Sequence, residues 1–200
     1  MSVGSIKTMT IEGLREKLEC YQVKLRESNG KIQQDIKRDF LYFISFLLVS
    51  DFKPNIIIEV GIGYGGWAYL MNELFLIKKL ILIDREFKRF DSMPFEWLTD
   101  VRKIKGESDS QEVLSRVGES LSGKKADLIH IDAAHTYAGV MADYLNYWNY
   151  LNKEGIMVFH DIKYEGVKKA FEEIILKHTA IRITSRKPSA KGGIGILINS

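Results

Sequence analysis

The feature that most constrains this chain is an alternation, between Ile56 and Phe159, of short apolar segments with longer segments of helical period. The short segments are rich in β-branched and other apolar residues, which is typical of strands buried on both faces. Helical patterns fill the intervals between them, as expected of a parallel sheet covered by helices on both sides. The sequence therefore predicts an α/β fold with a doubly wound, Rossmann-like sheet, with strands at 55–60, 80–83, 101–105, 127–131 and 155–159.

The C-terminal stretch follows a different pattern. Two extended runs, 181–184 and 194–198, are separated by the loop 185–193, which contains a proline and two adjacent glycines. No helix fits in so short a gap, and parallel strands need a long crossover, so we expect these two strands to pair antiparallel. A helix with one apolar face, about 166–177, precedes them. The predicted sheet is thus mostly parallel with an antiparallel strand pair at its C-terminal end.

The N-terminal quarter has two helical patterns, at 11–25 and 36–49. In the second pattern, apolar residues from Phe40 to Leu48 recur at helical spacing. We expect this stripe to pack on the sheet, and a dimer face or a lid is the alternative interpretation. The predicted domain organisation is an N-terminal helical extension over 1–50 and a cofactor-binding domain over 51–200.

Composition limits the kind of partner. With 29 basic and 26 acidic residues among 200, the net charge is only +3, too slight and scattered to argue for nucleic acid. A single cysteine, Cys20, indicates a reducing environment. The longest apolar run, 40–49, is about half of what a membrane span needs. We therefore expect a cytoplasmic protein that binds a small-molecule acceptor, with no nucleic-acid or membrane partner, and the sequence leaves a homodimer open.

The first strand runs into a glycine-rich turn that opens a helix. Glycines allow a sharp turn and close approach to a ligand, while the helix N-terminus offers free N–H groups. Gly61, Gly63 and Gly66 satisfy the G-x-G-x-x-G pattern, and Asp84 follows at the end of the second strand. This pattern alone favours a dinucleotide site, so an NAD(P)-dependent oxidoreductase is one hypothesis.

Glu59, at the end of the first strand, favours another ligand. A carboxylate at this position repels a pyrophosphate and attracts a cationic group such as the ammonium of an amino acid. An adenosine with a positively charged tail fits such a site better than a dinucleotide. The alternative interpretation of Glu59 is a helix-capping or surface acid.

The segment from Glu59 to Gly65 resembles the first motif of class I S-adenosylmethionine-dependent methyltransferases, E/D-x-G-x-G-x-G. The resemblance implies that Glu59, Gly61, Gly63 and Gly65 hold the methionine and ribose portions of S-adenosylmethionine. It implies that Asp84 binds the ribose hydroxyls. It also implies that Glu107 and Ser108, after the third strand, line the adenine.

Carboxylates and imidazoles follow the next two strands. Asp132 and His135 come after the fourth strand, and His160 and Asp161 end the fifth. Parallel strands end at one edge of the sheet, so we expect these side chains to converge beside the glycine turn. Two aspartates with waters and substrate oxygens suit a hard cation such as Mg²⁺. The alternative for Asp132 is a helix cap, and His130, inside the fourth strand, is interpreted as a core histidine.

The stretch from Asp127 through Tyr137 to Asp161 is similar to metal-dependent sugar O-methyltransferases of the macrocin and mycinamicin type, and to cephalosporin-hydroxylase-like proteins. The resemblance implies that Asp132 and Asp161 are metal ligands and that His135 is the general base. The chain departs from the pattern at His160, where a carboxylate is usual. Either His160 is a ligand and favours Mn²⁺, Fe²⁺ or Zn²⁺ over Mg²⁺, or the metal is held weakly.

These features predict an S-adenosylmethionine-dependent O-methyltransferase that acts on a hydroxyl of a small polar acceptor, either a sugar or a vicinal diol. A divalent metal, Mg²⁺ or Mn²⁺, and a histidine base are expected to assist the reaction. Besides the oxidoreductase, the second alternative is a protein that binds S-adenosylmethionine but has lost catalysis through the substitution at His160.

Overall fold

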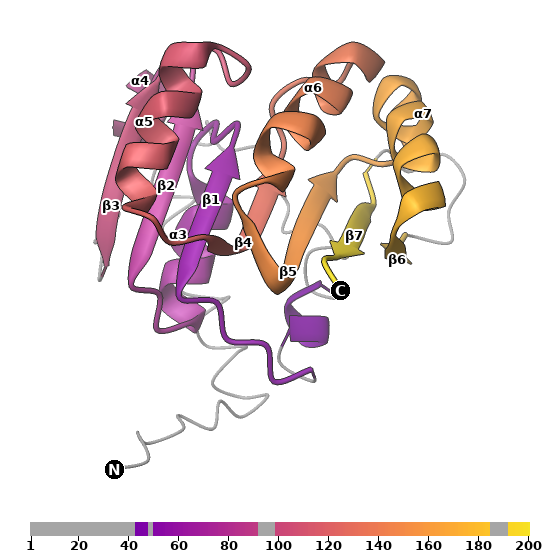
Figure 1. Cartoon of the computed structure of the whole chain (residues 1–200), viewed down its shortest axis with the longest axis horizontal. Helices are drawn as coiled ribbons and strands as arrows, with labels where there is room; N and C mark the ends of the chain where they lie inside the picture. Colours follow the sequence, from indigo (N-terminus) through magenta and orange to yellow (C-terminus); the bar gives the residue numbers. More distant parts are fainter. Residues whose placement is uncertain (1–42, 48–49, 92–98, 185–191) are drawn as a thin grey trace. The chain divides into compact units, whose positions relative to one another are not determined.

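The computed structural model describes residues 43–47, 50–91, 99–184 and 192–200. These residues include a seven-stranded sheet with the strand order β3-β2-β1-β4-β5-β7-β6 (Figure 1). Strands β1 to β5 are parallel, and β7 lies between β5 and β6 and is antiparallel to both. The strands are β1 (Ile56–Val60), β2 (Lys79–Asp84), β3 (Asp100–Lys105), β4 (Ala126–Ile131), β5 (Leu151–His160), β6 (Thr179–Ile183) and β7 (Ile194–Ile198).

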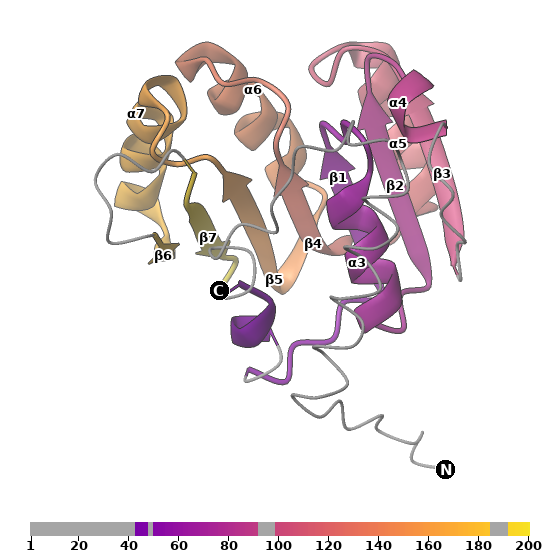
Figure 2. The same ribbon diagram turned by 180° about the vertical axis from the view of Figure 1, so that it is seen from behind.

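Helices cover both faces of this sheet. Figure 1 shows α5, α6 and α7 in front of the strands, and Figure 2 shows α3 on the opposite face. The helices are α3 (Gly66–Leu74), α4 (Lys88–Asp91), α5 (Gln111–Leu121), α6 (Tyr137–Trp148) and α7 (Glu165–Ile174), followed by the 3-10 turn η1 (Ile175–Lys177). The predicted Rossmann-like α/β class is therefore confirmed.

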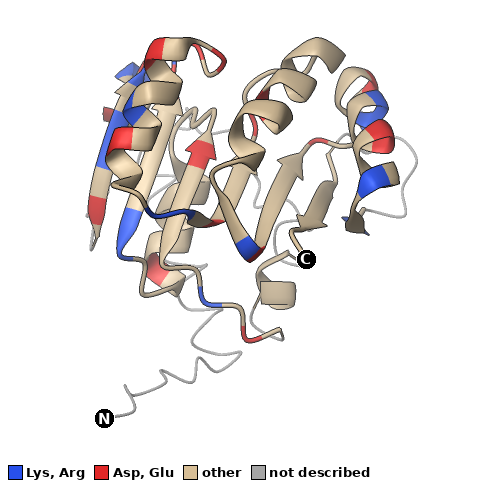
Figure 3. Ribbon diagram, in the orientation of Figure 1, with Lys and Arg blue, Asp and Glu red and all other residues tan. Residues whose placement is uncertain are grey.

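The main core lies between the sheet and the layer formed by α5, α6 and α7. Strand β1 is buried along its whole length, because helices cover it on both sides. Helix α5 begins where the Ser110 side chain accepts a hydrogen bond from the Val113 N–H, and it turns its apolar face to the core. Figure 3 shows charged residues along α5 and α7, and most of these residues are exposed. Glu59 on β1 and Asp143 on α6 are the exceptions among the described carboxylates, since both are buried.

The predicted strands match the observed ones closely, with one informative difference. The fifth strand was expected at 155–159, but β5 begins at Leu151, because Leu151 already pairs with Ala126 at the start of β4. The register between the two strands then shifts by a bulge before Leu128 meets Ile156. The expected antiparallel pairing of the two C-terminal strands is confirmed, and β7 joins this pair to β5.

Most of the predicted N-terminal extension, including the helix at 11–25, lies outside the described residues. Within the second predicted helix, residues 43–47 are helical, and Phe43, Ile44 and Leu47 of the apolar stripe are buried. This burial agrees with the packing interpretation of the stripe. The described part of the chain contains no helix with the length and apolar character that a membrane span requires.

Candidate active site

The turn after β1 lies directly against the turn after β4. Gly61, Gly63 and Gly65 have φ angles of 84°, 56° and 78°, a region that side chains other than glycine rarely adopt. A Cβ on Gly61 would lie only 2.5 Å from the Ala133 Cα and from the Asp132 carbonyl oxygen. Glycine is therefore required here for two reasons, and its small size brings Asp132 next to the glycine turn.

Asp84, at the end of β2, holds this turn in place. Its Oδ2 accepts hydrogen bonds from the N–H groups of Ile62 at 2.8 Å and Gly63 at 3.2 Å. Its Oδ1 accepts one from the Glu86 N–H at 3.2 Å. Oδ2 thus accepts two hydrogen bonds and Oδ1 one, so the second lone pair of Oδ1 remains compatible with a hydrogen bond to a ribose hydroxyl. The structure thus gives Asp84 a turn-fixing role that the sequence did not indicate.

Glu59 lies beneath the glycine turn, with only 2% of its surface exposed. Its carboxylate accepts a hydrogen bond from the backbone of Ala68 in the first turn of α3, and its Oε1 lies 3.5 Å from His130 Nδ1. Burial, reinforced by the negative charges of Asp132 and Asp84, raises the pKa of the Glu59 carboxyl well above its usual range. The structure therefore supplies a contact for the helix-capping interpretation of Glu59.

His130 is a buried histidine of the sheet, 2% exposed, as its position in β4 predicted. Its ring stacks on Trp67 at 4.2 Å between centroids, with the planes 14° apart. Burial lowers the pKa of His130 to about 3, so the ring is neutral at physiological pH. Trp67 therefore packs on His130, whose ring centre lies 6.1 Å from that of His160.

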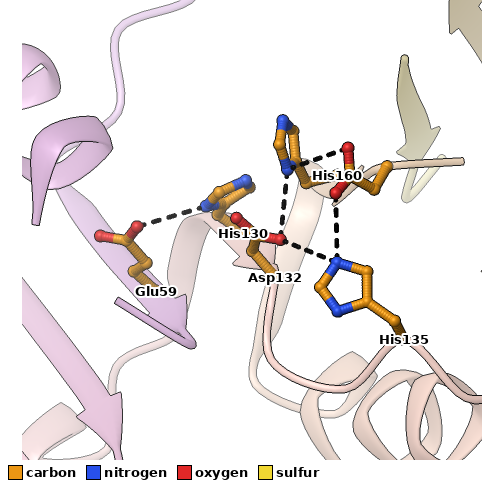
Figure 4. A network of polar contacts seen from close by, with 6 residues as sticks. Glu59, His130, Asp132, His135 and His160 are labelled. Atoms are coloured by element: carbon orange, nitrogen blue, oxygen red, sulfur yellow. Dashed lines mark hydrogen bonds and ion pairs between the residues drawn. The ribbon is translucent and has the colours of Figure 1, made fainter. Parts of the chain in front are cut away.

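Four side chains converge where β4 and β5 end (Figure 4). His135 Nε2 lies 3.2 Å from Asp161 Oδ2 and 3.8 Å from Asp132 Oδ1. His160 Nδ1 lies 3.2 Å from Asp132 Oδ1 and 3.7 Å from Asp161 Oδ1. The structure thus brings together the carboxylates and imidazoles that the sequence placed at this edge of the sheet.

This group has the geometry of a cation site. Ligand atoms of Asp132, His135 and Asp161 all lie within 4.8 Å of one another. Two carboxylates and an imidazole suit Mg²⁺, Mn²⁺ or another divalent transition metal. This set contains His135, whereas the set expected from the sequence contains His160. Since both imidazoles contact both carboxylates, the ligand set remains a prediction.

Asp161 adopts a conformation that is uncommon for a residue with a side chain. Its φ is 55°, in the left-handed region, which aspartate tolerates better than most residues. The Tyr164 N–H donates a hydrogen bond of 2.7 Å to the Asp161 carbonyl, which fixes the sharp exit from β5 into α7. The backbone therefore turns the Asp161 carboxylate toward Asp132 and His135.

The electrostatics of the cluster affect His135 most clearly. The hydrogen bond to Asp161 and the two nearby negative charges raise the pKa of His135, against the opposing effects of burial and of His160. His135 is also the more accessible imidazole, with 38% of its side chain exposed compared with 17% for His160. An accessible imidazole whose charged form is stabilised by carboxylates is suited to accepting a proton from a bound molecule.

Two residues that the sequence did not indicate hold the segment after β3. Ser108 Oγ donates a 2.6 Å hydrogen bond to Asp143 Oδ1, and the Tyr147 hydroxyl donates a 2.8 Å hydrogen bond to the Ser108 carbonyl. Asp143 is 1% exposed, and burial raises its pKa to about 6. The only sequence signal for Asp143 and Tyr147 was their spacing of four residues, which places them on the same face of α6. Glu107 is exposed and Ser108 is half-buried.

Two tyrosines close to the cluster, Tyr137 and Tyr164, differ in their contacts. The Tyr164 ring lies 5.3 Å from the His135 ring, at the opening of the cluster. In contrast, the Tyr137 hydroxyl donates a 2.6 Å hydrogen bond to Glu173 of α7. Tyr164 is therefore the aromatic side chain that the structure places beside His135.

Comparison with known proteins identifies the class to which this fold and site belong. A family model described as a methyltransferase domain matches residues 58–162, more than half of the chain, and the chain belongs to this family. It is an S-adenosylmethionine-dependent methyltransferase of class I. The hypothesis of an NAD(P)-dependent oxidoreductase is therefore not supported. The glycine pattern alone left it open, because this pattern is common to both classes.

Three known proteins show what the chain is similar to. Ribosomal RNA large subunit methyltransferase E of Burkholderia mallei (strain SAVP1) is 28% identical over 157 residues, which cover 68% of this chain and 69% of that protein. TomG, an O-methyltransferase of Streptomyces achromogenes solved with SAM, has a TM-score of 0.62 at 13% identity, covering 92% of this chain and 90% of TomG.

The third protein is the MycE methyltransferase of the mycinamycin biosynthetic pathway, solved with Mg, SAH and mycinamycin VI. It has a TM-score of 0.62 at 11% identity, covering 88% of this chain. The chain spans about half the length of MycE, 53%. At these identities, MycE and TomG support the fold.

Proposed function

We propose that this protein transfers the methyl group of S-adenosylmethionine to a hydroxyl oxygen of a small polar acceptor, assisted by a divalent metal ion. The observation that carries the proposal is the cluster of Asp132, His135 and Asp161, whose ligand atoms lie within 4.8 Å of one another. This cluster adjoins the glycine turn, because Gly61 contacts the Asp132–Ala133 backbone. A methyl donor and an acceptor would therefore meet at one edge of the sheet.

The cofactor would lie over the turn formed by Gly61, Gly63 and Gly65, where the absence of side chains leaves the backbone accessible. Asp84 would bind the ribose, and Glu107 and Ser108 would line the adenine. Glu59 would act from below, by holding the N-terminus of α3 and by adding negative charge when its proton is lost. The TomG structure, which contains SAM, supports the cofactor assignment.

Asp132 and Asp161, together with His160, would hold the metal ion. The donor set fits such an ion, because both carboxylates are partly buried and His160 Nδ1 lies 3.2 Å from Asp132 Oδ1 and 3.7 Å from Asp161 Oδ1. When bound, a divalent cation lowers the pKa of a coordinated hydroxyl and neutralises the two carboxylates. The MycE structure, which contains Mg, supports this assignment.

His135 would be the general base. Its Nε2 faces Asp161 Oδ2 at 3.2 Å and donates the hydrogen bond to it, so the other ring nitrogen, Nδ1, would accept the hydroxyl proton. Asp161 would stabilise the resulting imidazolium. The acceptor oxygen then forms a bond to the methyl carbon as the bond from that carbon to sulfur breaks, in line. The products are a methyl ether, S-adenosylhomocysteine and a proton that leaves from His135.

A sugar hydroxyl is the preferred acceptor and a vicinal diol the second. The MycE complex with a natural product supports a small-molecule acceptor. The 28% identical relative is named for ribosomal RNA, which makes an RNA hydroxyl a further candidate. A cytoplasmic location and a homodimer remain predictions from the sequence.

Replacement of the cluster residues tests the proposal. We expect Asp132→Ala and His135→Ala each to abolish methyl transfer while S-adenosylmethionine binding, followed by calorimetry, stays largely intact. Acceptors would be screened with radiolabelled cofactor against sugars, diols and RNA oligonucleotides, with and without Mg²⁺ or Mn²⁺. Full activity of either variant, or activity of the wild type in excess chelator, would contradict the metal-and-base mechanism. An empty metal site at saturating Mn²⁺ would instead support the non-catalytic alternative.

A further inference from the structure

A cavity of about 310 Å³ opens between α7 and the edge strand β6, outside the cluster described above. Ile162 and Phe171 provide its apolar part, and three basic side chains, Lys163, Lys168 and Arg182, line it with a single acidic one, Glu172. The volume is within the range of small-molecule sites. Figure 1 shows β7 and β6 at the end of the sheet, next to α7.

The side chains that line the cavity carry more positive than negative charge, which favours the binding of an anion. Lys168 Nζ lies 3.9 Å from Glu172 Oε1, so one lysine is loosely neutralised on its own helix. The Arg182 guanidinium carbon lies 5.6 Å from the centre of the Phe171 ring, which orients this side chain over the apolar part. The lining of the cavity therefore holds three cations and one carboxylate, which is an excess of positive charge.

Backbone contacts fix the wall of the cavity. The Lys163 N–H donates a 3.0 Å hydrogen bond to the Gly192 carbonyl, and the Ile162 N–H donates one of 3.3 Å to Gly193. Gly195 of β7 pairs with Arg182 of β6, and its α-carbon faces the Phe171 ring. Arg182 and Phe171 therefore share one face of the sheet. The three cations therefore come from the segment after β5, from α7 and from β6.

The cavity is connected to the candidate active site through one short segment. Lys163 follows Asp161 by two residues, so the same segment contributes a side chain to each. Across the sheet, His160 pairs with Ile194, and Ile194 pairs with Ile183, the neighbour of Arg182. Two strand spacings of about 4.8 Å place the backbones of His160 and Ile183 about 10 Å apart. Because Ile183, and not Arg182, is in register with His160, the Arg182 side chain points to the opposite face of the sheet from His160, and an acceptor that reaches both would cross this end of the sheet.

We propose that this cavity binds the phosphoryl groups of the methyl acceptor, which is therefore a sugar phosphate of the nucleotide-diphosphate sugar class. The inference deepens the proposed function and rests on it. Arg182 supplies planar, paired N–H donors that match phosphate oxygens, and the two lysines supply compact charges. The apolar part accommodates the less polar portion of the acceptor, while its hydroxyl reaches His135.

Direct binding of inorganic pyrophosphate to the cofactor-free protein tests the cavity itself. We expect wild-type protein to bind pyrophosphate in calorimetry, with an affinity that falls as salt is raised. The double variant Lys168→Gln, Arg182→Gln should bind about tenfold more weakly or not at all. Lys169→Gln is the matched control, because Lys169 is the next residue of α7 and lies over Tyr137, outside the cavity. Equal affinity of the double variant and the control would overturn the proposal.

A second measurement separates this inference from the proposed function. Methyl transfer to a nucleotide-diphosphate sugar is compared with transfer to the same sugar without phosphates. We expect the double variant to raise KM for the charged acceptor with kcat retained, and to leave the uncharged one unchanged. Failure of the proposed function would appear as no methyl transfer in any protein, independently of pyrophosphate binding. Methyl transfer with the same KM in both proteins would contradict the cavity assignment alone.

Discussion

The two imidazoles of the site differ in exposure, and this difference indicates different roles. His135 and His160 both approach Asp132 and Asp161, at 3.2–3.8 Å. Only His135 has more than a third of its side chain exposed, so only His135 is readily reached by an acceptor hydroxyl. Proximity to carboxylates alone does not separate a base from a ligand, but accessibility does.

Alanine substitutions separate the roles of the two histidines. His135→Ala is expected to lose turnover and to retain bound Mn²⁺, because Asp132, His160 and Asp161 remain. His160→Ala is expected to weaken Mn²⁺ binding by about tenfold to a hundredfold, since it removes a ligand nitrogen. Manganese binding followed by electron paramagnetic resonance measures both effects. Loss of manganese from His135→Ala with retention in His160→Ala would reverse the two assignments.

Asp143 makes the stability of the protein depend on pH. Its pKa rises from 3.8 to about 6 on folding, so the native state binds more protons between these values. Stability therefore falls as pH rises from about 4 to 6, and the cost above pH 6 is up to about 3 kcal/mol. In Asp143→Asn this dependence should be absent. Thermal denaturation from pH 4 to 7 measures it, with the exposed Asp91→Asn as a control that should keep the wild-type dependence.

At the scale of elements, the packing of α7 on β7 depends on one glycine. A Cβ on Gly195 would lie 2.4 Å from carbons of the Phe171 ring, and Phe171 is 1% exposed. Because the helix cannot retreat without opening the core, Gly195→Ala should destabilise the protein by about 1–3 kcal/mol. Gly118 on α5 provides the opposite case, since its nearest neighbour would be the Tyr150 hydroxyl at 3.9 Å.

Gly118→Ala should therefore stabilise the protein by up to about 1 kcal/mol, because alanine has the higher helix propensity. Urea denaturation of both variants gives the two free-energy changes with opposite signs. Destabilisation by Gly118→Ala equal to that of Gly195→Ala would show that the glycine contacts do not determine the effect.

The elements were largely predictable because their signals are local. Apolar runs and turn residues placed the strands, and parallel pairing placed Asp132 and Asp161 at one edge. Side-chain direction and long-range contacts have no such signal. The burial of Glu59 depends on the position of α3, and the hydrogen bond between Ser108 and Asp143 joins residues 35 positions apart. The basic cavity combines residues from α7, β6 and the segment after β5, so no single stretch of sequence indicates it.

At the scale of the whole molecule, the sheet brings opposite charges to separate places. Carboxylates gather where β1, β2, β4 and β5 end, around the glycine turn. The basic cavity lies beyond β7, at α7 and β6. By the two proposals above, a cationic methyl donor and a divalent ion would be attracted to the first place, and an anionic acceptor to the second. The reacting groups would therefore approach the site from two directions along one edge of the sheet.

Cofactor and metal should each stabilise the folded chain by mass action. A ligand at a hundred times its Kd adds about 2.7 kcal/mol, which raises Tm by about 5–10 °C for a chain of this size. We expect S-adenosylmethionine and Mn²⁺ each to raise the wild-type Tm, and Asp161→Asn to lose only the increment from Mn²⁺. Asparagine tolerates the left-handed backbone of Asp161, whose φ is 55°, so this variant should fold.

Asp51→Asn is the matched control for this thermal-shift measurement, because Asp51 also has a positive φ, 52°, and its side chain is 80% exposed beside Lys53. Both increments should persist in this control, since its carboxylate is paired with a surface lysine. An increment from Mn²⁺ that survives in Asp161→Asn would place the metal elsewhere. A lost increment from S-adenosylmethionine in that variant would instead mean that the Asp161 carboxylate attracts the cationic cofactor directly. The two ligands therefore report separately on the two halves of the site.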